Sequence, residues 1–369
     1  MRLTLIALGS RSAGPIYSFQ MAQALSKNAE LEMQIIISKE VDNMNSWDEE
    51  FLGRRNVHYH KIDTYKHNTL SVLASFLNPF KIGKLIKLVN NFKPDVVYCP
   101  FGLMWSSLVF PFLKNTKIIT TLHDPHPYTH GYTLSQFLLA NVGVLGEKFV
   151  KGRVVLNNKD FSFVLNKYRS EVQVIPHAAY SFYVPKNYLQ KNEITYRIAF
   201  MGRIDLYKGV DILVKAFVKL KTKGVKLLIA GSGHIDEEIM RIIDSDINIE
   251  LHNRYIANEE IPMFMQEVDM VVLPYTNATQ SGVIPMAFAF GKMVIATNVG
   301  SLAEQVPTGT GLLVSPNVDS IARAIDRMYA EENKILEFSN NAKCYADNNL
   351  TWEHSADLLF EFAKKIGKI

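Results

Sequence analysis

The chain has 369 residues, of which 48% are hydrophobic and 21% charged, and this composition excludes a disordered or fibrous protein. A single core of ordinary size serves about 100–150 residues, so the length predicts two domains. The formal net charge of +4 is unevenly divided, because residues 1–190 carry +8 and residues 191–369 carry −4. This division indicates that the first half faces an anionic partner.

The N-terminal sequence MRLTLIAL has a basic residue followed by an apolar run, as a signal peptide does. The run is shorter than the about 7–15 residues of a signal-peptide core, so it favours a first strand. No apolar run reaches the about 18–20 residues that span a bilayer, and we expect a cytoplasmic protein. Cys99 and Cys344 lie far apart in the sequence, which is typical of buried packing residues rather than of a disulfide or a metal site.

Apolar runs alternate with longer amphipathic stretches, the pattern of βαβ units with a parallel sheet. The predicted strands of the first half are 3–8, 33–38, 95–99, 117–122 and 152–156, with helices at 16–28 and 80–92. A polar segment at 184–196 predicts a linker. The predicted strands of the second half are 197–202, 225–231, 248–251, 269–275 and 292–297, and the helices between and after them are 209–222, 235–244, 258–267, 282–290 and 318–331. The fold class is α/β, with two doubly wound, Rossmann-like domains at residues 1–185 and 190–350.

Ligands of doubly wound sheets bind beyond the carboxyl ends of the strands, and with two such domains we expect a cleft between them. The loop GSRSAGP follows the first strand, and its Gly9 and Gly14 permit close approach of a ligand before a helix N-terminus. A plain Gly-Pro turn that opens a helix is the alternative. The dinucleotide fingerprint GxGxxG is absent.

A second loop, MGRIDLYKG, places Gly202, Arg203 and Lys208 around a helix start. Two cations beside backbone N–H groups suit a diphosphate, although the same spacing fits two solvated surface cations. The third loop, AGSGH, contains Gly231 and Gly233 and either carries a ligand or forms a plain turn.

A fourth loop, TQSG, precedes the helix predicted at 282–290. Its Ser281 and Gly282 place backbone donors at a helix N-terminus, which would suit an anion or a hydroxyl group. The apolar helix that follows also fits an ordinary core element.

The segments MGRIDLYKGVD and QSGVIPMAFAFGKMVIATNVGSLAE together resemble the donor-binding half of glycosyltransferase family 4, the large group 1 of retaining GT-B enzymes. The resemblance extends over nearly the whole chain, through the Gly14 loop, LHDPHP, VIPHA and TWEHSADLLFEF (351–362). It implies the GT-B fold, in which two Rossmann-like domains face a central cleft. It also implies that a C-terminal helix at 352–366 packs back on the first domain.

The resemblance also implies roles for individual residues. Arg203 and Lys208 match the cations that hold the donor diphosphate and steady the leaving nucleotide, and His123 matches a histidine that reaches the donor sugar. Gly14 matches a residue that meets the donor phosphate or sugar, and residues 254–256 match the segment that lines the nucleobase. The implied donor-binding residues are Gly14, Gly202, Gly231, Tyr255, Ile256, Gln280, Ser281, Gly282, Val283 and Ile284.

The chain departs from the family at the Glu-x7-Glu motif, where it has Ala278 and Met286. The loop offers Thr279, Gln280 and Ser281 instead, which are neutral groups able to bind sugar hydroxyls, and Glu304 is retained just downstream. This departure leaves a non-catalytic nucleotide-sugar-binding protein as an alternative. A sugar-nucleotide epimerase of related architecture is the other alternative, although that class needs carboxylates of which this site offers few.

No metal site and no cofactor are expected, because the nucleotide sugar is itself a substrate. His123, His126 and His130 share one loop, but no cysteine or carboxylate set completes a metal site with them. Asp244 and Asp246 form an Asp-x-Asp motif at a polar helix end, away from the loops that follow strands. Nucleic acid is disfavoured as a partner, because the basic excess has no stacked aromatic platform.

The predicted helix 80–92 lies in segment 71–93, which places apolar residues beside Lys81, Lys84 and Lys87 in the basic half. An amphipathic helix packed on its sheet fits this pattern, and so does a helix that docks on an anionic membrane. The apolar residues are Phe80, Ile82, Leu85, Ile86 and Val89. The resemblance implies a glycan or polyprenyl-linked acceptor in polysaccharide, lipopolysaccharide or glycolipid biosynthesis, so we expect peripheral attachment to the cytoplasmic membrane face.

Overall fold

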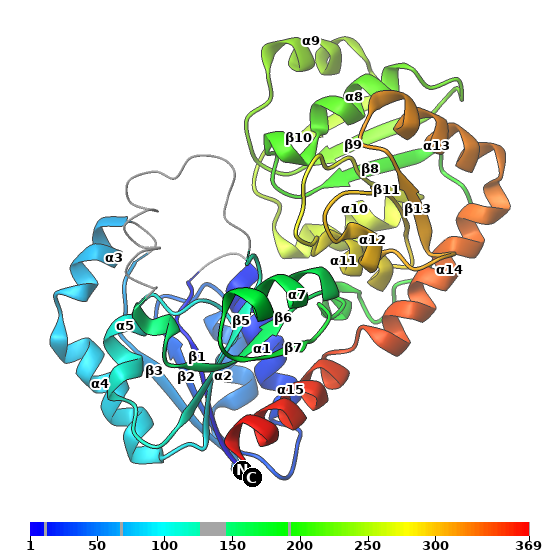
Figure 1. The fold of residues 1–369 in the computed structure, drawn as a ribbon. Helices are drawn as coiled ribbons and strands as arrows, with labels where there is room; N and C mark the ends of the chain where they lie inside the picture. Colours follow the sequence, from blue (N-terminus) through cyan, green and yellow to red (C-terminus); the bar gives the residue numbers. More distant parts are fainter. Residues whose placement is uncertain (11–12, 67–68, 126–144, 191–192, 369) are drawn as a thin grey trace. The chain divides into compact units, whose positions relative to one another are not determined.

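The computed structural model describes residues 1–10, 13–66, 69–125, 145–190 and 193–368 (Figure 1). The chain divides into two compact units, the first made of residues 1–176 and 352–369 and the second of residues 177–351. The second unit therefore begins before the polar segment 184–196 that was predicted as the linker. Hydrogen bonds hold these earlier residues to it, because the Ala179 amide donates to the Leu350 carbonyl at 2.7 Å and the Tyr183 hydroxyl donates to Asn258 at 3.0 Å.

Within the described residues, the first unit has a seven-stranded parallel sheet of order β3-β2-β1-β4-β5-β6-β7. Its strands are β1 (Arg2–Ala7), β2 (Glu32–Ser38), β3 (Val57–Ile62), β4 (Val96–Cys99), β5 (Lys117–Leu122), β6 (Val150–Val155) and β7 (Glu171–Val174). The strand order reverses between β1 and β4. The loops after these two strands therefore flank the switch point, where doubly wound folds bind ligands.

Helices cover this sheet: α1 (Ala13–Leu25), α2 (Met44–Phe51), α3 (Thr69–Phe76), α4 (Pro79–Phe92), α5 (Ser106–Val109), α7 (Asn158–Lys167) and α15 (Trp352–Gly367). The C-terminal helix α15 lies beside α1 although more than 300 residues separate them in the sequence (Figure 1). Trp352 packs edge-on against Tyr17, with ring centroids 5.2 Å apart. A Cβ atom on Gly152 of β6 would lie 2.9 Å from the Phe362 ring, so α15 rests directly on the sheet.

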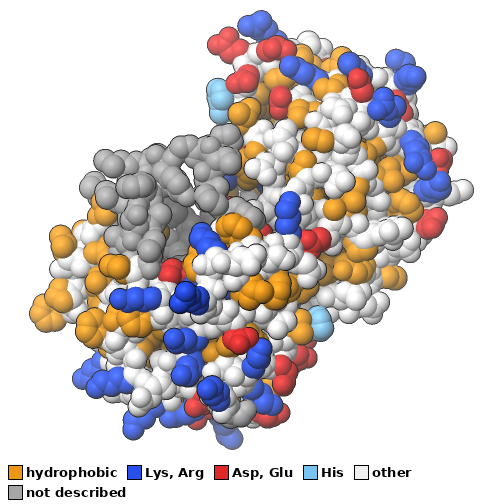
Figure 2. All heavy atoms as spheres, viewed as in Figure 1, with side chains coloured by type: hydrophobic (Ala, Val, Ile, Leu, Met, Phe, Trp, Pro, Cys, Tyr) orange, Lys and Arg blue, Asp and Glu red, His pale blue; other side chains and the backbone are white. Residues whose placement is uncertain are grey.

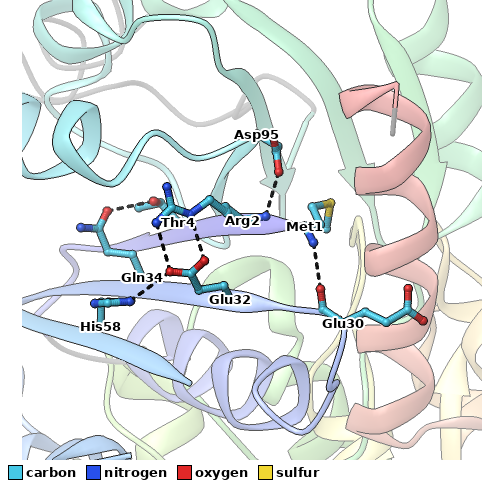
Figure 3. A network of polar contacts seen from close by, with 8 residues as sticks. All are labelled: Met1, Arg2, Thr4, Glu30, Glu32, Gln34, His58 and Asp95. Atoms are coloured by element: carbon cyan, nitrogen blue, oxygen red, sulfur yellow. Dashed lines mark hydrogen bonds and ion pairs between the residues drawn. The ribbon is translucent and has the colours of Figure 1, made fainter. Parts of the chain in front are cut away.

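A polar network lies at the N-terminal ends of β1, β2 and β3, which is the end of the sheet away from the switch point (Figure 3). The Arg2 guanidinium donates two hydrogen bonds of 3.0 Å to Glu32, its register partner on β2, and lowers the pKa of that carboxyl. His58 lies 3.2 Å from the same carboxylate, and the Arg2 amide donates to Asp95 at 2.8 Å. Because each group binds a neighbouring strand and lies away from the switch point, the network fixes strand register.

The second unit has a six-stranded parallel sheet of order β10-β9-β8-β11-β12-β13 within the described residues. Its strands are β8 (Arg197–Met201), β9 (Lys226–Ala230), β10 (Ile249–His252), β11 (Met270–Leu273), β12 (Met293–Thr297) and β13 (Gly311–Val314). The helices are α8 (Val210–Val218), α9 (Glu237–Ser245), α10 (Ile261–Glu267), α11 (Val283–Ala289), α12 (Leu302–Gln305), α13 (Val318–Ala330) and α14 (Glu332–Asn349). Here the order reverses between β8 and β11, so the loops after these strands flank the second switch point.

Most predicted elements are confirmed, with bounds that shift by a few residues. The pattern did not predict the strands β3, β7 and β13, each at or beside a sheet edge. Cys99 is buried as expected, whereas Cys344 is exposed on α14, so the prediction of two buried cysteines is wrong for the second.

Helix α4 packs on the core of the first unit through one face. Its Ile82, Leu85 and Val89 side chains are buried in that core, so these predicted membrane-facing residues are unavailable to a membrane. The alternative of an amphipathic helix packed on its sheet therefore holds for these three residues. The exposed apolar residues lie instead at the turn between α3 and α4, where Leu77 is 85% and Phe80 is 88% exposed.

Candidate functional site

The switch point of the second unit is flanked by the loops 202–209 and 274–282. The first of these continues from β8 through Gly202, whose φ of 118° favours glycine. Arg203 follows, and its Nε atom pairs with Asp205 at 2.8 Å on the unit's surface. The charge of this predicted cation is thus partly offset by a carboxylate.

Lys208 ends the short 3-10 turn Leu206–Lys208 in the same loop. Its Nζ atom donates a hydrogen bond of 2.8 Å to the Tyr275 hydroxyl and lies 4.2 Å from the centroid of that ring. The next residue, Gly209, has a φ of 67°, and a Cβ atom there would lie 2.1 Å from the Pro274 carbonyl oxygen. The Thr276 amide donates to the Tyr207 carbonyl at 2.8 Å. The two loops are therefore locked together around Lys208.

The neutral loop before α11 is held by Ser281, which is buried. The Ser281 amide donates to the Gln305 side-chain oxygen at 2.7 Å, and Gln305 donates back to the Ser281 carbonyl at 3.1 Å. The Val283 amide donates to the Ser281 hydroxyl at 3.2 Å. The Ser281 amide, which was predicted as an open backbone donor, is therefore occupied by Gln305, and the Val283 amide that follows is occupied by the Ser281 hydroxyl.

Gln280 keeps hydrogen-bonding capacity in this loop. Its Oε1 atom is buried and accepts no hydrogen bond within the part of the chain that the structure describes. A buried carbonyl oxygen without a donor costs free energy, so a ligand hydroxyl or amide that reached it would be stabilised.

The loops that follow β8 and β9 run side by side as an extension of the sheet. The Ile204 amide donates to the Ser232 carbonyl at 2.8 Å, and a Cβ atom on Gly231 would lie 1.9 Å from the Gly202 oxygen. Gly233 is equally close to the Ile204 oxygen. The glycines of this predicted loop therefore allow its backbone to pack closely against the loop after β8, and the loop forms one wall of a groove.

That groove has a volume of about 590 Å³ and lies within the second unit. Apolar residues line it together with polar and charged side chains of the two loops and of the start of α8, which are Arg203, Asp205, Asp211, Ser232, His234 and Asp236.

Residues 254–256 follow β10, the next strand along the sheet. Tyr255 is 67% exposed, and Ile256 beside it is half-buried. Arg254 is held by Glu260, to which its Nη1 atom donates at 2.8 Å. The guanidinium, aided by the Ala257 amide, lowers the pKa of Glu260 to about 2. The ion pair fixes the loop and leaves the Tyr255 ring at the surface.

Gly282 touches two side chains that the sequence did not point to. A Cβ atom on Gly282 would lie 3.4 Å from the Tyr180 hydroxyl and 3.9 Å from His177 Nε2. These two groups hydrogen-bond to each other at 3.1 Å, and burial lowers the pKa of His177. His177 belongs to the segment VIPHA, and the resemblance of that segment to the family is the sequence signal for this contact. Of the remaining predicted residues, Val283 contacts the Gly202 turn and Ile284 is fully buried in the core.

In the first unit His123 follows β5, the strand next to β4 and one strand away from the switch point. The Nε2 atom of His123 lies 2.9 Å from the Pro100 carbonyl, which follows β4 and can only accept, so Nε2 carries the proton. The imidazole packs against the Tyr17 ring at 4.6 Å and the Phe101 ring at 4.2 Å. A Cβ atom on Gly14 would lie 3.2 Å from that Phe101 ring, so the predicted loops after β1 and β5 meet around it.

Residues 195–331 match the family model of glycosyl transferases group 1. This part of the second unit is therefore similar to group 1 glycosyltransferases. Of the predicted site residues, the matched stretch holds Arg203, Lys208 and Ser281, whereas His123 and Gly14 lie outside it.

Similar proteins agree with this assignment. The chain is 30% identical over 169 residues to an uncharacterised glycosyltransferase of Methanocaldococcus jannaschii, and the aligned segment covers 43% of this chain and 42% of that protein. It is 28% identical over 177 residues to a D-inositol 3-phosphate glycosyltransferase of Rhodococcus opacus, covering 44% of this chain and 40% of that protein. The chain therefore spans less than half the length of these curated relatives.

The fold extends beyond the matched domain. The structure of the Anabaena protein HepE in complex with UDP-glucose superposes with a TM-score of 0.71 over 99% of this chain and 100% of that one, at 15% identity. The predicted GT-B fold, made of two Rossmann-like units, is confirmed.

The two carboxylate positions of the family motif hold neutral residues in this chain. Ala278 and Met286, at the family's carboxylate positions, are buried. Asp246 caps the end of α9 and accepts from the Asn248 amide at 2.9 Å, which agrees with a surface position for the Asp-x-Asp motif. Across the described residues, no group of three or more His, Cys, Asp or Glu side chains could hold a metal ion. His126 and His130 lie outside the described residues.

Proposed function

We propose that the protein is a retaining, family 4 glycosyltransferase that transfers a sugar from a nucleotide-sugar donor. The observation that carries the proposal is the pair of cations Arg203 and Lys208 in the loop after β8, at the switch point of a unit similar to group 1 glycosyltransferases. UDP-glucose bound to a structural neighbour supports a nucleotide sugar as the donor class.

The reaction requires charge stabilisation more than a strong base. In a same-face substitution the acceptor oxygen bonds to the anomeric carbon as the diphosphate leaves, and the leaving diphosphate takes the acceptor's proton. Lys208 and Arg203 would stabilise the negative charge that develops on that diphosphate. We assign the nucleobase to Tyr255 and Ile256, and contact with the donor sugar to His123. No metal is assigned a role.

The neutral loop replaces the carboxylates that the family uses near the ribose. The Gln280 Oε1 atom, buried and lacking a donor among the described residues, supports the binding of a sugar or ribose hydroxyl by this loop. Such a hydrogen bond satisfies an acceptor that costs free energy in the unliganded protein.

A panel of nucleotide sugars that includes UDP-glucose tests the proposal. We expect at least one donor to raise the melting temperature and to be slowly hydrolysed by the purified protein, because a ligand that binds the folded state stabilises it. Stabilisation without hydrolysis or transfer would favour a non-catalytic binding protein. Interconversion of the bound sugar, without its release, would favour an epimerase.

We further propose a glycan or polyprenyl-linked acceptor and peripheral attachment to an anionic membrane at the cytoplasmic face, in polysaccharide, lipopolysaccharide or glycolipid biosynthesis. None of the helices in the described part of the chain is long and apolar enough to cross a bilayer. The turn between α3 and α4 exposes Leu77 and Phe80, and the exposed Lys84 and Lys87 follow on α4. Figure 2 shows hydrophobic side chains gathered over this edge of the first unit. Apolar anchors beside cations suit an anionic lipid surface.

Liposome co-sedimentation tests this attachment. Binding is expected to rise with the anionic lipid fraction, to fall with salt, and to be lost in Leu77→Ser/Phe80→Ser and in Lys84→Glu/Lys87→Glu. Ile247→Ser in the second unit removes a side chain that is 99% exposed and serves as the matched control. Equal recovery in the supernatant with neutral and anionic liposomes at low salt would contradict the attachment.

A further inference from the structure

Lys208 differs from Arg203 in the partner that holds it. Arg203 pairs with a carboxylate, whereas the Lys208 ammonium donates to a neutral hydroxyl, that of Tyr275, and forms no ion pair within the described residues. A hydroxyl acceptor fixes an ammonium group at the end of a flexible four-carbon stem without cancelling its charge. The full positive charge of Lys208 is therefore kept for a ligand.

Tyr275 is itself held rigidly. It is 1% exposed, and its carbonyl accepts from the Thr297 hydroxyl at 2.5 Å. Its hydroxyl lies 3.3 Å from the Ser281 hydroxyl, and Ser281 is fixed by the reciprocal pair with Gln305. A chain of hydrogen-bonded residues, none of them a carboxylate, therefore runs from Lys208 through Tyr275 and Ser281 to Gln305 of α12.

We infer that Tyr275 is a positioning residue that orients Lys208 and couples it to the neutral loop 278–282. The inference rests on the proposed function, because it gives Lys208 a leaving diphosphate to stabilise. This coupling holds the Lys208 ammonium group, which stabilises the leaving diphosphate, at a fixed distance from the loop that binds the donor hydroxyls. Small displacements of such groups reduce the rate strongly, since electrostatic stabilisation depends on preorganisation.

Tyr275→Phe tests this role, because it keeps the ring and removes the hydroxyl. The assay is hydrolysis of UDP-glucose, or of whichever nucleotide sugar of the panel stabilises the wild-type protein most. We expect kcat to fall about tenfold while KM for the donor changes less than about twofold. Tyr188→Phe is the matched control, because it removes a hydroxyl that donates to the Phe290 carbonyl at 3.1 Å elsewhere in the second unit. That control is expected to keep the wild-type kcat.

The Lys208→Ala/Tyr275→Phe double variant separates positioning from a purely structural role. If Tyr275 acts through Lys208, the double variant is no slower than Lys208→Ala alone, since residues that act as a unit are not additive. Additive losses, or a Tyr275→Phe enzyme with wild-type kcat, would overturn the inference while the proposed function stands. Absence of turnover in the wild-type protein with every donor would instead count against the proposed function.

If Tyr275→Phe does not fold, Ser281→Ala tests the same coupling through the next contact, that between the Tyr275 and Ser281 hydroxyls. It keeps the tyrosine and removes the group that the tyrosine hydroxyl contacts. We expect a lower kcat in the wild-type background and no further loss in the Lys208→Ala background. An equal loss in both backgrounds would overturn the coupling.

Discussion

Replacement of Lys208 by alanine is the most direct test of the proposed chemistry. Two unit charges about 4 Å apart interact by about 4 kcal/mol at an effective dielectric constant of about 20. Lys208 is partly exposed, so screening reduces this value, and we take about 3 kcal/mol as the loss of transition-state stabilisation. Each 1.36 kcal/mol corresponds to about tenfold in rate, so Lys208→Ala should lower kcat/KM about a hundredfold or more.

Arg203→Ala should also lower kcat/KM, by a smaller factor, because Asp205 already offsets part of the guanidinium charge. The assay is donor turnover at saturating and limiting donor, with melting temperatures measured in parallel to confirm folding. Lys219→Ala removes an exposed, ion-paired cation on the same unit and should leave turnover unchanged. Lys208→Ala activity within about threefold of wild type would refute the reasoning.

Three further outcomes are expected. Gly231→Ala should destabilise the protein by about 2 kcal/mol or more in urea unfolding, because the φ of Gly231 is 154° and the new Cβ atom would lie 1.9 Å from the Gly202 oxygen. The control Gly224→Ala, at a φ of 79° but in open space, should destabilise it clearly less. Equal losses of stability in the two variants would contradict the steric argument. Burial depresses the pKa of His177, so the unfolded state binds more protons below about pH 6.5 and stability should fall there by up to about 1.4 kcal/mol per pH unit; an unchanged pH slope in His177→Gln would reject this source. EDTA should leave donor turnover unchanged, whereas a full loss restored by magnesium or manganese would contradict a metal-free reaction.

The sequence predicted most of the fold because buried parallel strands are continuous apolar runs. Strands such as Met293–Thr297, with every residue buried, need no tertiary information to be found. The edge strand β3 was missed because only its first and last residues, Val57 and Ile62, are buried and the polar residues between them are exposed or partly buried. The pattern of α4 fitted both a helix packed on its sheet and a helix that docks on a membrane. Only the structure shows that Ile82, Leu85 and Val89 lie in the core, whereas Phe80, in the first turn of α4, is exposed.

The sequence could predict where each candidate site residue lies relative to its own strand, but not which residues of other strands it contacts. Arg203 and Lys208 follow a strand directly, so topology alone places them at its carboxyl end. The contact of Lys208 with Tyr275 joins residues 67 positions apart and depends on β8 and β11 being neighbours, which the sequence pattern does not state. The occupied Ser281 amide depends likewise on Gln305, 24 residues further on.

The second unit is an insertion within the first, and this has a consequence for biosynthesis. A ribosome completes residues 1–176 long before it reaches α15, yet Trp352, Leu359 and Phe362 of that helix are buried in the first unit. During translation the first sheet therefore exposes the surface around Tyr17 and Gly152 until the entire second unit has been made. The second unit has no such dependence, since its residues are contiguous, and it can fold first although it is synthesised later. A nascent chain stopped before residue 352 would thus carry a complete second unit on an incomplete first unit, whose exposed apolar surface favours aggregation.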